Sequence, residues 1–200
     1  MPLLFKQNIE NAVLAFWSIT ESEDELARLV TGEDRLSARR FSNRDRRMQH
    51  LAWRAALRAI APDTEISYLP DGETPYVDGA DTYVSAAHTD GAAVAMLSPG
   101  RCAVDVENVN RDFNRAAPRF VSERERQLPA SGDPRFLPAM WCAKEAMYKY
   151  AGVAGLDFLT GMTVASIDLD KGSAEGVIEG MEGVRIGFLR SGDFIVAYII

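Results

Sequence analysis

The sequence has few cysteines and histidines and no long apolar run, and these absences narrow its function. Two cysteines and two histidines among 200 residues exclude a disulfide framework and a four-cysteine zinc site. No apolar run reaches the roughly 18 residues of a membrane span, and no apolar leader opens the chain, so we expect a cytoplasmic protein that is neither membrane-bound nor secreted. The formal net charge of −7 argues against a dedicated nucleic-acid binder.

What is present is typical of a globular protein. Hydrophobic residues make up 47% and charged residues 26% of the chain, which suits one large domain or two small ones. Helices are expected over residues 21–31, 42–60 and 134–151. Alternating apolar residues and turn signals predict strands at 66–69, 82–86, 92–97, 102–106, 162–169, 176–178, 184–189 and 194–200. Strands 92–97 and 102–106 are expected to form a hairpin, and Asp71-Gly72 a loop.

Capping residues predict where several helices begin and end. Thr20 with Glu23 indicates a capping box for the first helix, which Thr31-Gly32 is expected to end. Ser122 with Glu125 predicts a short capped helix in the second half of the chain. Gly152 is expected to end the long helix that follows, because glycine readily adopts the left-handed conformation of a C-cap.

A weak internal repeat links the two halves of the chain. Residues 89–97 resemble residues 191–199, since in each a small polar turn leads into a strand that contains Val-Ala. The two segments lie about one hundred residues apart, half the length of the chain. A duplicated α+β unit would produce this match, and so would chance, because strands that follow turns often look alike.

Two acids in the strand 102–106 and just after it carry the sharpest chemical signal. Asp105 and Glu107 are two residues apart, so on a strand both side chains lie on the same face. Two neighbouring carboxylates repel each other unless a cation lies between them. Mg²⁺ is a suitable cation because it prefers oxygen ligands. A solvent-exposed strand end with two acids is the alternative.

A second signal lies in the expected helix 134–151. Residues 141–149 read Trp-Cys-Ala-Lys-Glu-Ala-Met-Tyr-Lys, which places Glu145 and Lys149 one turn apart on one face. An exposed ion pair is the simple interpretation. The aromatic and methionine neighbours indicate a buried helix, however, and beside that burial Glu145 could bind a metal while Lys149 holds a phosphate.

Cationic groups in the first half of the chain form a third signal. His88 precedes a turn, where a ligand can reach it, although a lone histidine at a strand end is more often structural. On the helix 42–60, three arginines fall within about 40° of one another beside the apolar stripe, and two further polar residues lie on the exposed back. The three are Arg47, Arg54 and Arg58, and the two on the back are Arg46 and His50. Such a strip is a candidate phosphate site or simply a solvated face.

Taken in order, these segments resemble the 4′-phosphopantetheinyl transferases of the surfactin-synthetase-activating type, nearest their enterobactin-type and mycobacterial branch. The resemblance rests on residues 50–54 (His-Leu-Ala-Trp-Arg), 104–107 (Val-Asp-Val-Glu) and 141–149, the last being similar to the family's Trp-x-x-Lys-Glu-Ala-x-x-Lys. It covers about residues 40–150. The segment Gly72-Glu73-Thr74-Pro75 departs from the family's Gly-Lys-Pro, and Ala87-His88 lacks the family's hydroxyl.

The resemblance implies an α+β fold of two similar, pseudo-symmetric lobes, residues 1–98 and 99–200, with the active site at their interface. It implies a monomer that transfers the 4′-phosphopantetheine of coenzyme A to a serine of an acyl or peptidyl carrier protein and releases 3′,5′-ADP. Such carriers belong to fatty-acid, polyketide or nonribosomal-peptide assembly. Mg²⁺ would be held by Asp105, Glu107 and Glu145.

The remaining site roles follow from the same resemblance. Glu145, directly or through a metal-bound water, would be the base for the serine hydroxyl, and Lys149 would hold a phosphate oxygen. The nucleotide end of coenzyme A would be bound by His88, Arg46, Arg47 and Arg54. Residues 110–126 are the candidate docking segment for the carrier protein because they directly follow the strand that holds the two acids, and they offer Arg111, Phe113, Arg115, Arg119 and Phe120. An ordinary loop before a capped helix is the alternative.

Two other interpretations stay open. The missing Gly-Lys-Pro lysine and the missing hydroxyl suggest a degenerate paralogue that binds carrier proteins without turnover. The acids Asp105 and Glu107 also suit an unrelated Mg²⁺-dependent phosphohydrolase, but the sequence offers no nucleophile set to accompany them.

Overall fold

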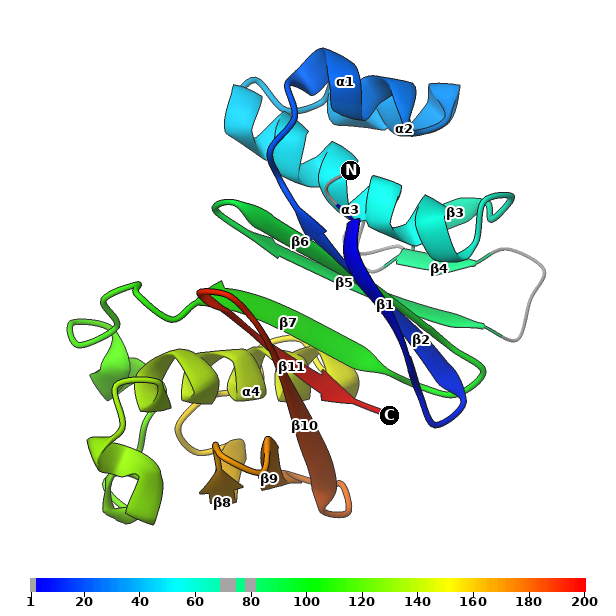
Figure 1. Ribbon diagram of the computed structural model, residues 1–200. Coiled ribbons are helices and arrows are strands. Elements are labelled where there is room, and N and C mark those ends of the chain that lie inside the picture. The colour runs from blue at the N-terminus through cyan, green and yellow to red at the C-terminus, as the bar shows by residue number, and fades with distance from the viewer. Residues whose placement is uncertain (1–2, 69–74, 78–81) are drawn as a thin grey trace. The chain divides into compact units, whose positions relative to one another are not determined.

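The computed structural model describes residues 3–68, 75–77 and 82–200. The chain divides into two compact units, unit 1 (Met1–Cys102) and unit 2 (Ala103–Ile200) (Figure 1). Each unit is an antiparallel sheet packed against helices, so the predicted α+β class is confirmed. The expected loop at Asp71-Gly72 and most of the segment 72–75 lie outside the described residues.

Unit 1 contains a six-stranded sheet in the order β1-β2-β6-β5-β4-β3. Its strands are β1 (Leu3–Ile9), β2 (Ala12–Ser18), β3 (Ile66–Tyr68), β4 (Pro75–Val77), β5 (Tyr83–Thr89) and β6 (Ala92–Ser98). The helices are α1 (Glu23–Arg28), α2 (Gly32–Ala38) and α3 (Arg44–Ile60), and α3 lies along one face of the sheet (Figure 1). The sequence analysis missed β1, β2, β4 and α2.

The capping residues of unit 1 differ from the expected ones. Ser22, not Thr20, caps α1. Its hydroxyl accepts a hydrogen bond from the Glu25 amide, and the Glu25 carboxylate accepts one from the Ser22 amide. Thr31 does not end that helix but begins α2 through a capping box with Asp34. The helix predicted over 21–31 is therefore the shorter α1, and the second capping box begins a separate helix, α2, that was not predicted.

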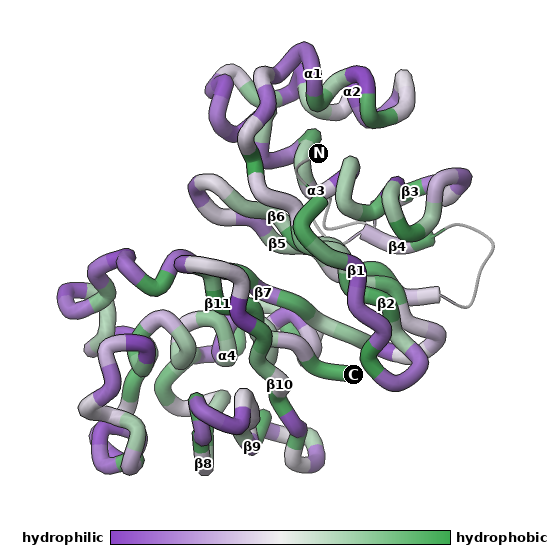
Figure 2. Tube along the Cα trace, in the orientation of Figure 1, coloured by the Kyte–Doolittle hydropathy of each residue, from purple (hydrophilic) through white to green (hydrophobic). Residues whose placement is uncertain are grey.

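Unit 2 contains a five-stranded sheet in the order β7-β11-β10-β9-β8. Its elements are β7 (Ala103–Asn108), α4 (Phe136–Ala151), β8 (Met162–Asp168), β9 (Ser173–Ile178), β10 (Val184–Ser191) and β11 (Phe194–Ile199). Three short 3₁₀ turns, Ala117–Arg119, Glu125–Gln127 and Pro129–Gly132, join β7 to α4. Gly152 ends α4 at φ 64°, as predicted. The strand β11 is hydrophobic along most of its length (Figure 2).

The hairpin predicted between 92–97 and 102–106 is wrong. Strand β6 pairs with β2 and β5 in unit 1, whereas β7 pairs with β11 in unit 2. The turn signal at Ser98-Pro99-Gly100-Arg101 is real, but it precedes the boundary between the two units at Cys102. Short-range signals mark the end of a strand but not its partner.

The two units share one topology apart from β1. In each, a first strand is followed by a helix and then by four consecutive strands, the last of which returns beside the first. The register agrees as well, because β6 pairs Ala92 with Ser18 and β11 pairs Phe194 with Asn108. The similar segments 89–97 and 191–199 therefore occupy matching positions, as expected of a duplicated unit.

Candidate active site

The acids of β7 point toward the helix of unit 2. Asp105 pairs with Ala197 of β11, and Glu107 pairs with Ile195, so both acids lie on the sheet face that α4 covers. Asp105 is 8% exposed and Glu107 is 3% exposed. The register match gives unit 1 apolar residues, Ala15 and Trp17, at the corresponding positions of β2. Only unit 2 carries acids there.

Asp105 has a cationic partner from α4. Lys149 Nζ donates to Asp105 Oδ1 at 2.8 Å and to the Val104 carbonyl at 3.1 Å. Burial raises the pKa of Asp105, and the Lys149 ammonium opposes that rise. Lys149 therefore pairs across to β7, and not within its own helix as the spacing to Glu145 suggested.

Glu107 also has a cationic partner, in the segment that follows β7. Arg111 forms an ion pair with Glu107 Oε2, and Oε1 accepts the Asn108 amide at 3.0 Å. The Arg111 guanidinium lies 4.8 Å from the centre of the Phe113 ring. Because the Arg111 side chain is 55% exposed, it can leave Glu107 without losing a buried position.

Glu145 lies in α4 within the electrostatic reach of both β7 acids. Burial raises its pKa, the charges of Asp105 and Glu107 raise it further, and Lys149 opposes the rise. Glu107 in turn contributes to the raised pKa of Asp105. The three predicted carboxylates therefore share one neighbourhood in which a bound cation would relieve their repulsion.

The three acids offer the right donors for a hard cation but form no finished coordination shell. Among the described residues, no group of three or more potential ligands is close enough to hold a metal as it stands. Carboxylate oxygens suit Mg²⁺, and their mutual repulsion favours a cation among them. The three carboxylates are therefore suitable Mg²⁺ ligands once Lys149 has left Asp105 and Arg111 has left Glu107.

The arginines of α3 do not form the free cationic strip that their spacing suggested. Arg47 makes a two-pronged ion pair with Glu23 at 2.7 and 3.0 Å. Arg54 is 1% exposed and donates to Asp34 at 3.0 Å, with Tyr68 as a further partner. Arg58 also pairs with Asp34. Arg46 is exposed to solvent.

His88 lies at the end of β5 on the face that α3 covers. It pairs with Ala93 of β6, and its neighbours on the same face, Val84 and Ala86, contact the helix side. The side chain is half-buried. The contact of His88 with a ligand at the β5–β6 turn stays a prediction.

His50 was expected on the exposed back of its helix, and this expectation is wrong. It is 6% exposed, its Nε2 lies 2.8 Å from Ser37 Oγ, and its Nδ1 lies 3.2 Å from Arg54 Nη1. Burial and then the Arg54 charge lower its pKa to about 3. The small helix α2, which the sequence analysis missed, supplies the cover.

Because His50 is buried, we expect the free energy of unfolding to decrease at acidic pH. The unfolded chain binds a proton below about pH 6.5, whereas the native His50 stays neutral down to about pH 3, so stability falls as pH drops through this window. The loss from one such group is up to about 1.4 kcal/mol per pH unit. Urea unfolding at several pH values should show a shallower dependence of the free energy of unfolding on pH for His50→Gln than for the wild type. Equal slopes for wild type and His50→Gln would contradict the assignment.

A fully buried ion pair in unit 2 escaped the sequence analysis. Lys144 and Glu125 both have 0% exposed side chains and lie 2.8 Å apart. Lys144 also donates to the carbonyls of Phe158 and Met162, at 2.6 and 2.7 Å. The predicted bonds between Ser122 and Glu125 are present, but they lead into the single 3₁₀ turn Glu125–Gln127 and not into an α-helix. The pair ties α4 to the segments before and after it.

The segment 110–126 is anchored by aromatic packing. Phe113 and Phe120 were expected to face a partner, but they are 3% and 0% exposed and pack against Trp141 of α4. Their burial leaves Arg115 and Arg119 on the outside. The exposed surface of this segment is therefore basic rather than aromatic.

Comparison with known proteins agrees with this reading of unit 2. Residues 101–198, which span nearly all of unit 2, match the sequence model of the 4′-phosphopantetheinyl transferase superfamily. The match includes Asp105, Glu107 and Glu145 and supports phosphopantetheine transfer as the class of activity. A comparison with curated proteins returns no match. Among the described residues, no helix is long and apolar enough to cross a membrane.

Proposed function

We propose that the protein transfers 4′-phosphopantetheine from coenzyme A to a serine of an acyl or peptidyl carrier protein, with Mg²⁺ and release of 3′,5′-ADP. The observation that carries this proposal is the joint placement of Asp105, Glu107 and Glu145 on facing elements of unit 2, inside the family match. Their mutual repulsion favours a bound cation, as a pyrophosphate-bearing substrate needs.

The acids have separate duties in this proposal. Asp105 and Glu107 would hold Mg²⁺ together with Glu145, and the metal would supply charge neutralisation for the pyrophosphate. Lys149, which forms an ion pair with Asp105 in the structure, would then bind a phosphate oxygen with its ammonium group. Arg111 would likewise leave Glu107.

Glu145 is the proposed general base for the serine hydroxyl. Its pKa is raised by burial and by the neighbouring acids, which strengthens it as a proton acceptor relative to an exposed glutamate. The serine proton would pass to a Glu145 carboxylate oxygen as the serine oxygen bonds to the β-phosphorus. The 3′,5′-ADP then leaves with the electrons of the broken P–O bond.

The nucleotide end of coenzyme A is proposed to contact unit 1. The half-buried His88 and the exposed Arg46 would contact phosphate oxygens directly. Arg47 would have to exchange Glu23 for the phosphate, which is feasible at a half-buried position. Arg54, buried on Asp34, would act by holding α3 and Tyr68 in place.

Mass spectrometry tests the proposal directly. The protein is incubated with apo carrier protein, coenzyme A and Mg²⁺, and the carrier mass is measured. A gain equal to one phosphopantetheine supports transfer. An unmodified carrier in a stable complex supports the non-catalytic paralogue instead. If the carrier is neither modified nor bound, both interpretations are rejected.

The basic surface of residues 110–126 is the proposed carrier-docking site. Because a rim charge acts mainly on association, Arg115→Glu with Arg119→Glu should raise the Michaelis constant for carrier protein several-fold and leave coenzyme A affinity unchanged. Initial rates at low salt measure the Michaelis constant, and calorimetry measures the affinity for coenzyme A. The double variant Lys171→Glu with Arg185→Glu, which makes the same charge change elsewhere in unit 2, should keep wild-type kinetics. Wild-type efficiency of the first double variant would place docking elsewhere.

A further inference from the structure

A cavity of about 320 Å³ opens at one end of unit 2, and none of the three acids lines it, although its lining residue Ile195 pairs with Glu107 between β11 and β7. Its apolar floor comes from Phe188 of β10, Ile195 of β11 and Leu169 of the β8–β9 turn. Phe188 donates its amide to the Gly172 carbonyl at 2.8 Å, which holds that turn against β10. The size is at the lower end of small-molecule sites, so a compact ligand fits it.

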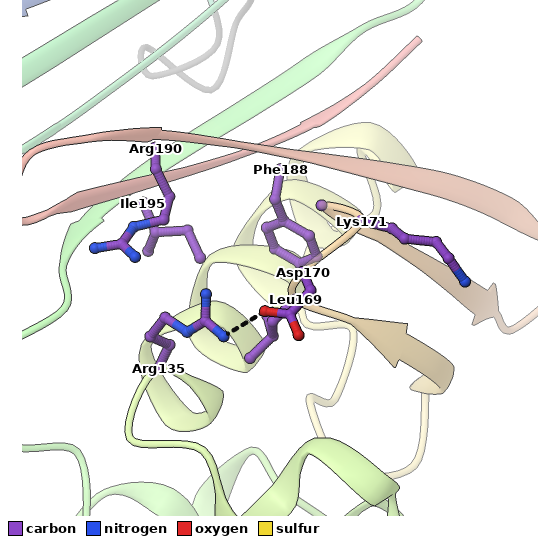
Figure 3. Close-up of a pocket in the computed structure, with 8 residues that line it drawn as sticks. Arg135, Leu169, Asp170, Lys171, Phe188, Arg190 and Ile195 are labelled. Atoms are coloured by element: carbon purple, nitrogen blue, oxygen red, sulfur yellow. Dashed lines mark hydrogen bonds and ion pairs between the residues drawn. The ribbon is translucent and has the colours of Figure 1, made fainter.

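Two arginines on the rim of this cavity, Arg135 and Arg190, differ in how many of their N–H donors are already bonded. Arg135 is bonded to Asp133 and, at 2.9 Å, to Asp170, so its charge is largely neutralised. Arg190 makes a single bond, to the Gly192 carbonyl at 3.3 Å. Figure 3 shows both guanidinium groups on the same side of the Phe188 ring, while Lys171 extends away from it. Arg190 therefore has N–H donors left for an anion.

The duplicated topology gives Arg190 a counterpart in unit 1. Arg190 pairs with Ile195 across the β10–β11 hairpin, just as His88 pairs with Ala93 across the β5–β6 hairpin. Each of the two cationic residues stands one position before the last pair of its hairpin, on the face covered by the helix. Each unit therefore presents a basic side chain at the same point of its sheet.

We propose that this cavity of unit 2 binds a phosphate monoester no larger than a nucleotide. The phosphate would accept hydrogen bonds from Arg190, whose planar fork suits phosphate oxygens, and from the remaining N–H donors of Arg135. The organic part would lie against Phe188 and Ile195. This proposal rests on the geometry of unit 2 alone. It is separate from the proposed transfer reaction, in which His88 of unit 1 contacts coenzyme A.

The test titrates the full chain with adenosine 3′,5′-bisphosphate and, separately, with inorganic phosphate and acetate. It uses His88→Ala as the background, so that binding at the corresponding point of unit 1 does not obscure the result. Calorimetry measures affinity, and amide resonances of Gly172 and Ser191 report on the cavity. In this background, Arg190→Ala should weaken bisphosphate binding about tenfold or more, as expected for a lost charge-assisted bond. Arg185→Ala, on the opposite face of the same strand, should change nothing.

The outcomes separate this site from the transferase proposal. Shifts at Gly172 and Ser191 that disappear in Arg190→Ala support the site, whether or not the chain transfers phosphopantetheine. Equal affinity in Arg190→Ala and Arg185→Ala overturns it, even if transfer is observed. Acetate that binds as tightly as phosphate also overturns it, because the ligand would then be a carboxylate. Thermal unfolding confirms that each variant is folded.

Discussion

Asp105→Asn should reduce phosphopantetheine transfer by about a thousandfold or more, because it removes a charge that the proposed Mg²⁺ site depends on. A loss of this size corresponds to about 4 kcal/mol of transition-state stabilisation, within the range that a bound metal supplies. The substitution keeps the shape of the side chain. The rate is measured by carrier mass against time under saturating Mg²⁺ and coenzyme A.

The fold should tolerate this change. Asparagine removes a buried charge whose pKa burial raises, and Lys149 can turn to water because its side chain is 31% exposed. The free energy of unfolding should therefore shift by no more than about 1 kcal/mol. Asp63→Asn, at an exposed acid just after α3 in unit 1, is the matched control and should keep full activity. An active Asp105→Asn variant would remove this acid from the metal site.

The sequence predicted the parts of the site that local spacing controls. Alternation on a strand places Asp105 and Glu107 on one face, and helical spacing with Gly152 at its end defines α4. The repeat at 89–97 and 191–199 is visible in the sequence because the matching strands of the two units both follow a two-residue turn and both bury Val-Ala at the same register positions.

Spacing could not show which partner each charge chooses. Arg47, Arg54 and Arg58 lie on one side of α3, but acids from α1 and α2, distant in sequence, neutralise them. His50 looked exposed for the same reason, since the cover comes from α2. A second capping box at Thr31 and Asp34 was the available signal for that helix, and the sequence analysis assigned Thr31 to a helix end instead.

The hidden pair of Lys144 and Glu125 shows this limit most clearly. In the sequence, Glu125 is one half of a capping box, and Lys144 is one letter of the segment 141–149. In the structure, the Glu125 carboxylate also accepts the Val164 amide at 2.8 Å. One acid therefore links the segment before α4, the helix itself and the strand β8. Only the three-dimensional contacts reveal this role.

Lys144→Met should destabilise unit 2 by about 3–5 kcal/mol, the usual penalty for leaving one charge of a buried pair alone. Burial lowers the pKa of Lys144 and Glu125 opposes that effect, so the lysine depends on this partner to stay charged. The carbonyls of Phe158 and Met162 lose their donor as well. Urea unfolding followed by circular dichroism measures the loss.

The double variant Glu125→Gln with Lys144→Met separates the pair from its surroundings. Glutamine removes the unpaired buried charge, and its single carbonyl oxygen can still accept one of the two amides, Ser122 or Val164, that bond separate oxygens of Glu125, so the double variant should be more stable than Lys144→Met alone. Lys171→Met, at an exposed lysine that pairs with Asp168, is the matched control and should change stability by about 0.5 kcal/mol or less. If Lys144→Met costs less than about 1 kcal/mol, or the double variant is the least stable of the three, the buried charge does not hold these segments together. In that case the aromatic contacts of Phe113 and Phe120 with Trp141 would be the main anchor of the segment before α4.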